Sequence, residues 1–327
     1  MNFKCKSCDA VMVFDPDLQV LKCPFCDSTG TEEKKGDDSM SVCPTCGGEL
    51  TPGQFTSADK CPYCGNFLIY DKRVEGEYKP DKVISFKVSK KKAVECMQKE
   101  FESRIFTPAD FLSEKTLVNM QGYYVPFFMY DYDVDSVYEG EGTKVTKSWR
   151  DGNYKCTETS TFLLKRHMRA AYDNVPADAS IAMPDGLMDL IEPYDYELLT
   201  DFDPKVLSGF LAEIYNMPSS EIEERARIKT TKSASRIVMD SMSGFSLGTP
   251  AVDKLASTLK ETEFALFPVW KYTYRHGGRI FDFYVNGQSG KVVGKTPVSK
   301  LKVFFYGLAT AGMWTIILSV VAGLLRI

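Results

Sequence analysis

Eight of the ten cysteines in this 327-residue chain form two units of identical spacing. Each unit has two CxxC pairs with fourteen residues between them, and the second unit repeats the first at a constant offset of 38 residues. The units comprise Cys5, Cys8, Cys23 and Cys26, and then Cys43, Cys46, Cys61 and Cys64. A match at all four positions indicates an internal duplication. Modules this small cannot rest on a hydrophobic core alone.

Paired CxxC motifs at this distance are typical of a four-cysteine zinc ribbon. Two residues between thiolates let one tight turn place both sulfurs on the same tetrahedral ion. We therefore predict two structural Zn²⁺ ions on the eight cysteines, each contributing an apparent binding free energy on the order of 10–16 kcal/mol to folding. Four sulfur ligands leave no open coordination position, which argues against catalytic zinc.

The backbone of each predicted turn needs a left-handed residue after the second cysteine. Gly47 and Gly65 occupy these places in the second unit, and Asp9 and Asp27, a less tolerant residue type, occupy them in the first. Two ligand partitions remain open, since each unit can close on itself or the two can cross-brace. The polar segment 28–40 predicts a flexible tether, which favours independent ribbons.

Redox chemistry is the alternative for the CxxC pairs, but the flanking βαβ pattern of a thioredoxin-like site is missing. The segment "MNFKCKSC" contains no apolar stretch of the kind found in secretory signals, so we expect a reducing compartment and metal binding instead of disulfides. Residues 1–72 carry seven lysines, no arginine and eleven carboxylates. Since nucleic-acid modules need clustered cations, this acidic segment predicts protein binding in preference to nucleic acid. We interpret the aromatic residues of the two units as small hydrophobic cores within the ribbons. They are Phe3, Phe25, Phe55 and Tyr63.

The other end of the chain is uncharged from Val303 to Leu325. A helix of this length spans about 34 Å, enough for a bilayer core of about 30 Å. Lys291, Lys295, Lys300 and Lys302 precede it, so the positive-inside rule places the bulk of the chain in the cytoplasm. We expect a single-pass cell-membrane protein. Gly307 and Ala311 have the small-xxx-small spacing that allows helix pairing and a homo-oligomer, although such spacing is common in apolar segments.

The central region predicts an α+β domain rich in strands. Val94, Met97, Phe101 and Ile105 recur at helical spacing, and residues 219–242 also predict a helix. Aromatic and branched residues indicate a strand over 122–140, and residues 279–295 indicate a hairpin turning near Asn286. The segments that start at Tyr124 and Leu266 resemble each other, which suggests two related halves. We divide the chain into ribbons at 1–29 and 42–72 with a linker at 30–41, a central domain at 78–300, and a transmembrane helix at 303–325.

Catalytic residues are not evident in the central domain. Asp131, Asp133 and Asp135 are spaced as in a calcium loop, but Ser136 and Gly142 occupy positions where such a loop needs glycine and glutamate. A strand with an acidic face explains them better. Nothing beyond residue type supports Cys156 and His167 as a nucleophile and base. We therefore expect a protein that is not an enzyme and has no organic cofactor.

With these features in view, the chain resembles the bacterial membrane proteins labelled "TFIIB-type zinc ribbon-containing". The CxxC pairs, the apolar C-terminal segment and "IEPYDYELLTDFDPKVLSGFLAEIYNMP" from Ile191 to Pro218 carry the resemblance. The resemblance implies association with a flotillin-like (SPFH) protein and phage-shock protein A homologues in a membrane-stress system. The expected function is a membrane-anchored adaptor that recruits a cytoplasmic partner. The alternative is a membrane-tethered factor that binds nucleic acid.

Overall fold

Two antiparallel strands of 31 residues each, β8 and β12, run through the centre of the protein. A computed structural model describes residues 1–30, 32–35, 41–108, 110–117 and 119–324. In the described residues the main sheet has ten strands, with the path β10-β7-β12-β8-β11-β5-β6, and with β9 on β8 and the β13–β14 hairpin on β12. The strands of this sheet are β5 Thr56–Lys60, β6 Phe67–Ile69, β7 Lys82–Val83, β8 Gln121–Asp151, β9 Tyr154–Asp178, β10 Thr200–Asp201, β11 Leu211–Glu213, β12 Ser246–His276, β13 Arg279–Asn286 and β14 Val292–Gly294.

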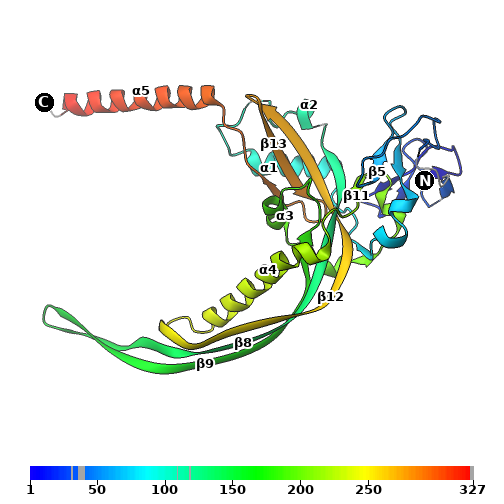
Figure 1. Cartoon of the computed structure of the whole chain (residues 1–327). Coiled ribbons are helices and arrows are strands. Elements are labelled where there is room, and N and C mark those ends of the chain that lie inside the picture. The colour runs from blue at the N-terminus through cyan, green and yellow to red at the C-terminus, as the bar shows by residue number, and fades with distance from the viewer. Residues whose placement is uncertain (31, 36–40, 109, 118, 325–327) are drawn as a thin grey trace.

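The helices lie on both faces of this sheet and at its end (Figure 1). They are α1 Lys90–Phe101, α2 Glu114–Leu117, α3 Asp185–Ile191, α4 Ser219–Asp240 and α5 Lys300–Leu324. The expected helices at α1 and α4 are confirmed, although α1 ends before Ile105, which is exposed. Ala93, Met97 and Phe101 form the buried stripe of α1. The hairpin near Asn286 is also confirmed.

The two segments that resemble each other are direct neighbours in the sheet. Pro126 of β8 lies opposite Leu266, and Pro268 of β12 lies opposite Tyr124, so the pairing is symmetric about its centre. Each long strand follows a short strand and a long helix and then turns back, as β7-α1-α2-β8-β9, with the one-turn helix α2 added, and as β11-α4-β12-β13. The short strands are exchanged, because β7 pairs in parallel with β12 and β11 with β8. This arrangement agrees with two related halves.

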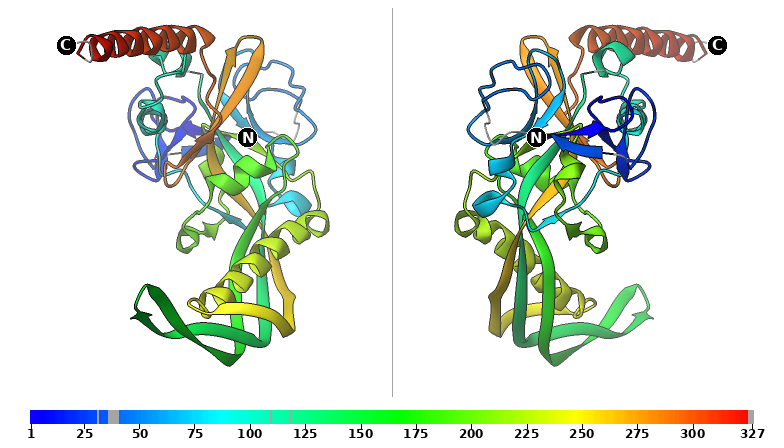
Figure 2. Two further views of the ribbon diagram at one scale, coloured as in Figure 1. Left: turned by 90° about the vertical axis from the view of Figure 1, so that its left-hand side faces the viewer. Right: turned by 90° about the vertical axis from the view of Figure 1, so that its right-hand side faces the viewer.

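We call the part of the main sheet that lies beside α1 and α3, together with these two helices, the body of the protein. Beyond the body, β8, β9 and β12 continue as a curved three-stranded arm covered on one face by α4 (Figures 1 and 2). Tyr130 and Tyr132 are buried under this helix, and their hydroxyls donate to carbonyls of Ser219 and Glu223 at 2.6 and 3.3 Å. The buried side of α4 includes the small residues Ala226 and Ala234, which let the helix lie close to strands β8 and β9. The helix thus stabilises strands that would otherwise be solvated on both faces.

The ribbons are joined to the body, and residues 32–35 of the predicted flexible tether form a strand. Short strands β1 Asn2–Cys5, β2 Val13–Asp15, β3 Val20–Lys22 and β4 Glu32–Lys35 form two small sheets, β1–β4 and β2–β3. Strand β4 lies within the predicted linker and pairs with β1. The second ribbon contributes β5 and β6 to the main sheet, where Ala58 lies opposite Ala212 of β11. Residues 31 and 36–40 of the linker lie outside the described part of the chain.

Helix α5 projects away from the body (Figure 1). It is long and apolar enough to cross a membrane, and no side chain between Lys300 and Val321 is buried. Its start is held to the body by the Ser299 amide, which donates to the Phe106 carbonyl at 2.8 Å, and by the Tyr306 ring against Phe106.

Candidate metal centres

The eight cysteines form two separate groups of four. Cys5, Cys8, Cys23 and Cys26 have their Sγ atoms within 4.8 Å of one another, as do Cys43, Cys46, Cys61 and Cys64. Each unit therefore closes on itself, and the cross-braced partition is not found. In every CxxC pair the first cysteine is buried and the second is exposed. Both groups could hold a metal ion.

Four equivalent turns bring the thiols together. In the first turn the Asp9 amide donates to the Cys5 carbonyl at 2.8 Å, and the same bond recurs at Asp27, Gly47 and Gly65. The donor residues have φ values of 57°, 59°, 72° and 74°, so all four adopt the left-handed conformation expected from the sequence. The turns aim two sulfurs of each CxxC pair in one direction, as a shared ion requires.

The sulfur separations agree with tetrahedral coordination. Metal–sulfur bonds of about 2.3 Å give sulfur–sulfur edges of about 3.8 Å in a regular tetrahedron. In the second group, Cys43 to Cys64 and Cys46 to Cys61 are both 3.8 Å. In the first group, Cys8 lies 3.4 Å from Cys23 and 3.6 Å from Cys26, so that group is slightly tighter. The chemistry of four thiolates suits Zn²⁺, which accepts this geometry without a redox change.

Hydrogen bonds prepare individual thiols for metal binding. The Ser28 hydroxyl lies 3.2 Å from Cys26 Sγ and, together with the Ser28 amide, lowers the pKa of Cys26 to about 6. At Cys61, burial acts to raise the pKa, but the amides of Cys64 and Tyr63 outweigh it and lower the pKa to about 7. These effects favour the thiolate, the form that binds metal, at Cys26 and Cys61, whereas the pKa of Cys8 and that of Cys64 are raised beside the other thiols of their groups.

One known protein is similar to this chain along nearly its whole length. It is the uncharacterized protein YdjG of Bacillus subtilis (strain 168), 32% identical over 324 residues, with 94% of each chain covered. The chain belongs to the YdjG family. No protein-family model matches it, and no solved structure matches it. The relative is itself uncharacterized, so the activity of this chain has to be argued from the site.

In this YdjG-family chain the ribbon aromatics are only partly the small cores that we expected. Phe3 is buried, and Phe55 is half-buried. Phe25 and Tyr63 are 81% and 68% exposed, so that prediction is wrong for them. They occupy the same position in the two ribbons, between the cysteines of the second CxxC pair.

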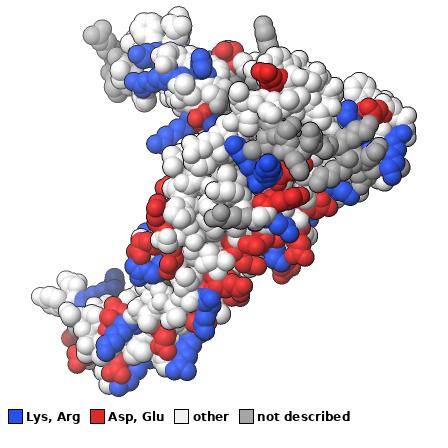
Figure 3. All heavy atoms as spheres, turned by 45° about the vertical axis from the view of Figure 1, so that its right-hand side comes forward, with Lys and Arg blue, Asp and Glu red and all other residues white. Residues whose placement is uncertain are grey.

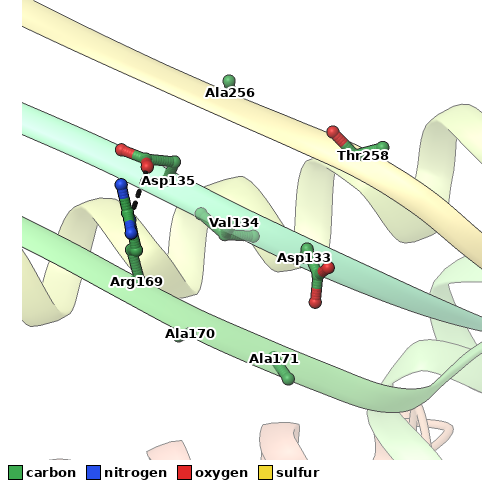
Figure 4. Close-up of a pocket in the computed structure, with 8 residues that line it drawn as sticks. All are labelled: Asp133, Val134, Asp135, Arg169, Ala170, Ala171, Ala256 and Thr258. Carbon is green, nitrogen blue, oxygen red and sulfur yellow. Dashed lines mark hydrogen bonds and ion pairs between the residues drawn. The ribbon is translucent and has the colours of Figure 1, made fainter.

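The acidic triplet of the arm is a strand face with cross-strand partners, as expected. The Asp131 carboxylate accepts from the Asn174 amide at 2.7 Å, and Asp133 pairs with Lys260 at 2.7 Å. Figure 4 shows Asp135 beside Arg169, at 3.0 Å, in a shallow hollow of about 420 Å³. Arg169 and His167 together lower the pKa of Asp135. These contacts explain the carboxylates without a calcium ion.

The remaining cysteines are not assembled into a catalytic group in the described residues. Cys156 and His167 lie on the same strand, β9, opposite Trp149 and Val137. Eleven residues of strand separate them by about 36 Å. His167 Nε2 instead lies 3.0 Å from Asp135. Cys96 packs beside the main core.

A cavity of about 730 Å³ lies where the second ribbon meets the sheet, and nothing in the sequence predicted it. Three lysines from distant segments line it, namely Lys60 of β5, Lys90 of α1 and Lys271 of β12. The only local signal is the sequence "SKKK", which places three cations in the first turn of α1. Cations are unfavourable at a helix N-terminus.

Proposed function

We propose that this protein is a membrane-anchored, zinc-binding adaptor without catalytic activity, whose ribbons capture a cytoplasmic protein. The observation that carries the proposal is the pairing of two features in one chain. One is the exposed apolar helix α5, and the other is the equivalent exposure of Phe25 and Tyr63 on two metal-binding ribbons. The helix would hold the protein in the cell membrane, with Lys291, Lys295, Lys300 and Lys302 keeping the body in the cytoplasm.

The paired aromatic residues suit protein capture. Exposed aromatic side chains on a rigid turn lose little entropy on binding and are enriched among residues that dominate protein interfaces. Two such residues on adjacent ribbons would act together, because the second contact forms at high effective concentration once the first is made. The partner we propose is a flotillin-like (SPFH) protein of a membrane-stress system, as the family resemblance implies.

Charge argues against nucleic acid as the partner of the ribbons. Residues 1–72 carry a formal charge of −4, and thiolate-bound zinc at two sites would bring it to about −8. On the face shown in Figure 3, acidic and basic side chains are intermingled along the arm. Nucleic-acid binding needs a continuous cationic surface to displace counterions.

The experiment is affinity purification of the full-length protein from membranes in mild detergent, followed by mass spectrometry and a zinc assay. We compare the wild type with the F25S/Y63S double variant and with the matched control I181S, which changes an exposed apolar residue far from the ribbons in sequence. A flotillin-like protein should co-purify with wild type and control, and its recovery should fall roughly 30-fold in the double variant, as for loss of an interface hot spot. Unchanged recovery, or co-purification of nucleic acid instead, would refute the proposal.

A further inference from the structure

The tip of the arm is a two-stranded hairpin that extends past the third strand and past α4. Strand β12 begins at Ser246, opposite Thr143, so only β8 and β9 continue beyond that point, as residues 144–160. Helix α4 ends at Asp240, and none of residues 144–160, all of which the structure describes, is buried. Isolated two-stranded hairpins are only marginally stable in water. A surface that covers the hairpin would therefore stabilise it.

The cations of the hairpin differ from those of the arm nearer the body. Residues 144–160 contain two carboxylates and four cations, in a chain with a formal net charge of −4. The cations are Lys144, Lys147, Arg150 and Lys155. None of the four forms an ion pair in the described part of the chain. Nearer the body, by contrast, Lys165 pairs with Glu139 at 3.0 Å. Arg169 likewise pairs with Asp135, also at 3.0 Å.

Two of these cations are held directly against each other. Arg150 and Lys155 are cross-strand partners on either side of the turn. Like charges in this arrangement destabilise a strand pair. Asp151 is next in the sequence, but it lies opposite Tyr154 and so belongs to the other face of the hairpin. A negatively charged surface would convert the repulsion at this end of the arm into attraction.

The other face of the hairpin carries two exposed aromatic side chains. Trp149 is 45% exposed and Tyr154 is 78% exposed. Trp149 lies opposite Cys156, and Tyr154 lies opposite Asp151, so the two rings share one face. Tryptophan and tyrosine are enriched where lipid headgroups meet acyl chains, because each has an apolar ring and a polar group. Aromatic residues beside unpaired cations are therefore suited to the surface of an anionic bilayer.

The hairpin and α5 extend to the same side of the body. Figures 1 and 2 agree on this from different directions, although the two elements leave the body at opposite ends. A bilayer that α5 enters would therefore lie on the side toward which the hairpin extends. This placement favours a membrane surface as the partner of the hairpin over a soluble protein.

We propose that the hairpin of residues 144–160 is a second membrane contact, which binds the anionic headgroup surface of the bilayer that α5 crosses. The inference rests on the proposed anchoring by α5. Arg150 and Lys155 contact lipid phosphates, and the rings of Trp149 and Tyr154 enter the headgroup region. Because α5 keeps the hairpin near the bilayer, this contact forms at high effective concentration. Two separate contacts fix the orientation of the body, and with it the direction in which the ribbons face.

The test measures tryptophan fluorescence of the full-length, zinc-loaded protein in nanodiscs of phosphatidylglycerol with brominated acyl chains, which quench tryptophans in contact with the bilayer. The chain has three tryptophans, of which Trp270 is buried in the body and Trp314 lies in α5. The W314F variant leaves Trp149 to report on the hairpin, and the W149F variant leaves Trp314 to report on the anchor. The double variant W149F/W314F retains only Trp270 and gives the background.

We expect quenching above background in both single variants. In W314F the quenching should fall when zwitterionic phosphatidylcholine replaces phosphatidylglycerol, and in W149F it should not, because α5 is held by apolar burial. Adding R150Q/K155Q to W314F should weaken the contact roughly 25-fold, since each cation near an anionic surface contributes about fivefold. The matched control is K232Q/K254Q, which changes two exposed lysines of α4 and β12 outside the hairpin and should leave the quenching unchanged.

The two reporters distinguish failure of this inference from failure of the anchor. Quenching of W149F with W314F at background would overturn the hairpin contact and leave anchoring by α5 intact. Background fluorescence of W149F would overturn the anchoring, and the inference that rests on it. Quenching of W314F that is equal in both lipids, or that K232Q/K254Q weakens as much as R150Q/K155Q, would exclude recognition of an anionic surface by the hairpin. Thermal unfolding verifies that each variant is folded.

Discussion

The two ribbons have the same cysteine spacing and the same turns, yet they are attached to the body by different means. The first ribbon is held mainly by side chains, since Phe3, Met12, Phe14 and Leu21 belong to the main hydrophobic core. The second is held by backbone pairing in the main sheet and has a small core of its own, formed by Cys43, Leu50, Cys61, Leu68 and Tyr70. A duplicated four-cysteine module thus keeps its local geometry while its surroundings diverge.

Metal removal should have the largest effect and should separate the two attachments. We expect the C5S/C8S variant to lose the zinc ion of the first ribbon and the C61S/C64S variant to lose that of the second. Each ribbon then loses the stabilisation that its metal supplies, for which the apparent binding free energy of a structural site is ~10–16 kcal/mol. Two amides report on the attachments by hydrogen exchange. The Phe14 amide, bonded to the Ser208 carbonyl at 2.7 Å, should lose protection in C5S/C8S. The Ile214 amide, bonded to the Phe55 carbonyl at 2.8 Å, should lose protection in C61S/C64S.

Equal loss at both amides in either variant would show that the ribbons are a single cooperative unit. In that case the difference in attachment has no energetic consequence. Zinc is measured in the same samples, so that incomplete metal loss is recognised.

Core truncation should have the next largest effect. Phe14→Ala removes a buried ring from the core shared with the body and should lower the free energy of global unfolding by ~3–5 kcal/mol. Leu68→Ala removes a side chain from the separate core of the second ribbon and should cost ~2–5 kcal/mol, mainly in local unfolding of that ribbon. Urea denaturation of the protein in micelles measures the first effect, and hydrogen exchange at β5 and β6 measures the second. A global loss from Leu68→Ala that matches Phe14→Ala would contradict the comparison.

Exchanging glycine and aspartate at the left-handed positions tests whether backbone strain distinguishes the two ribbons. A Cβ at Gly47 would meet no atom within 4 Å, so Gly47→Asp adds backbone strain alone. It should weaken zinc binding by the second ribbon about fivefold, corresponding to ~1 kcal/mol. Asp9→Gly should strengthen zinc binding by the first ribbon by a smaller factor, because it also removes the Lys4–Asp9 ion pair at 3.9 Å. Chelator competition measures both affinities, and a change of the opposite sign at either position would exclude backbone strain as the difference.

The smallest expected effect is in the pH dependence of the first ribbon. Protons compete with metal for thiolates, so a thiol with a lowered pKa keeps its metal to lower pH. Ser28→Ala removes the first cause of the lowered pKa of Cys26. We therefore expect the first ribbon to release zinc at a pH higher by about half a unit, since one hydrogen bond is worth ~0.5–1.5 kcal/mol. Asn66→Ala, at the matching position of the second ribbon, is the control, and an equal shift there would contradict the role of the Ser28 hydroxyl.

Local features of the metal centres were predictable from the sequence. The CxxC spacing identified all eight cysteines of the two groups, and the left-handed conformations of Asp9, Asp27, Gly47 and Gly65 followed from their place after each second cysteine. Helices α1 and α4 and the strand nature of β8 followed from periodicity and residue type. These features depend on residues within a few positions of one another, so a local pattern contains the information.

By itself, then, the sequence determined the two four-cysteine units, their turns, and an apolar helix long enough to cross a membrane. Only the tertiary structure decided that the ribbons dock on the body, that Phe25 and Tyr63 stay exposed, and that Lys60, Lys90 and Lys271 meet in one cavity. The Ser208 hydroxyl that fixes the first ribbon donates to the Met12 carbonyl from 196 positions away. The physical reason is that docking depends on shape and pairing between distant segments, and these become defined only when the long strands come together.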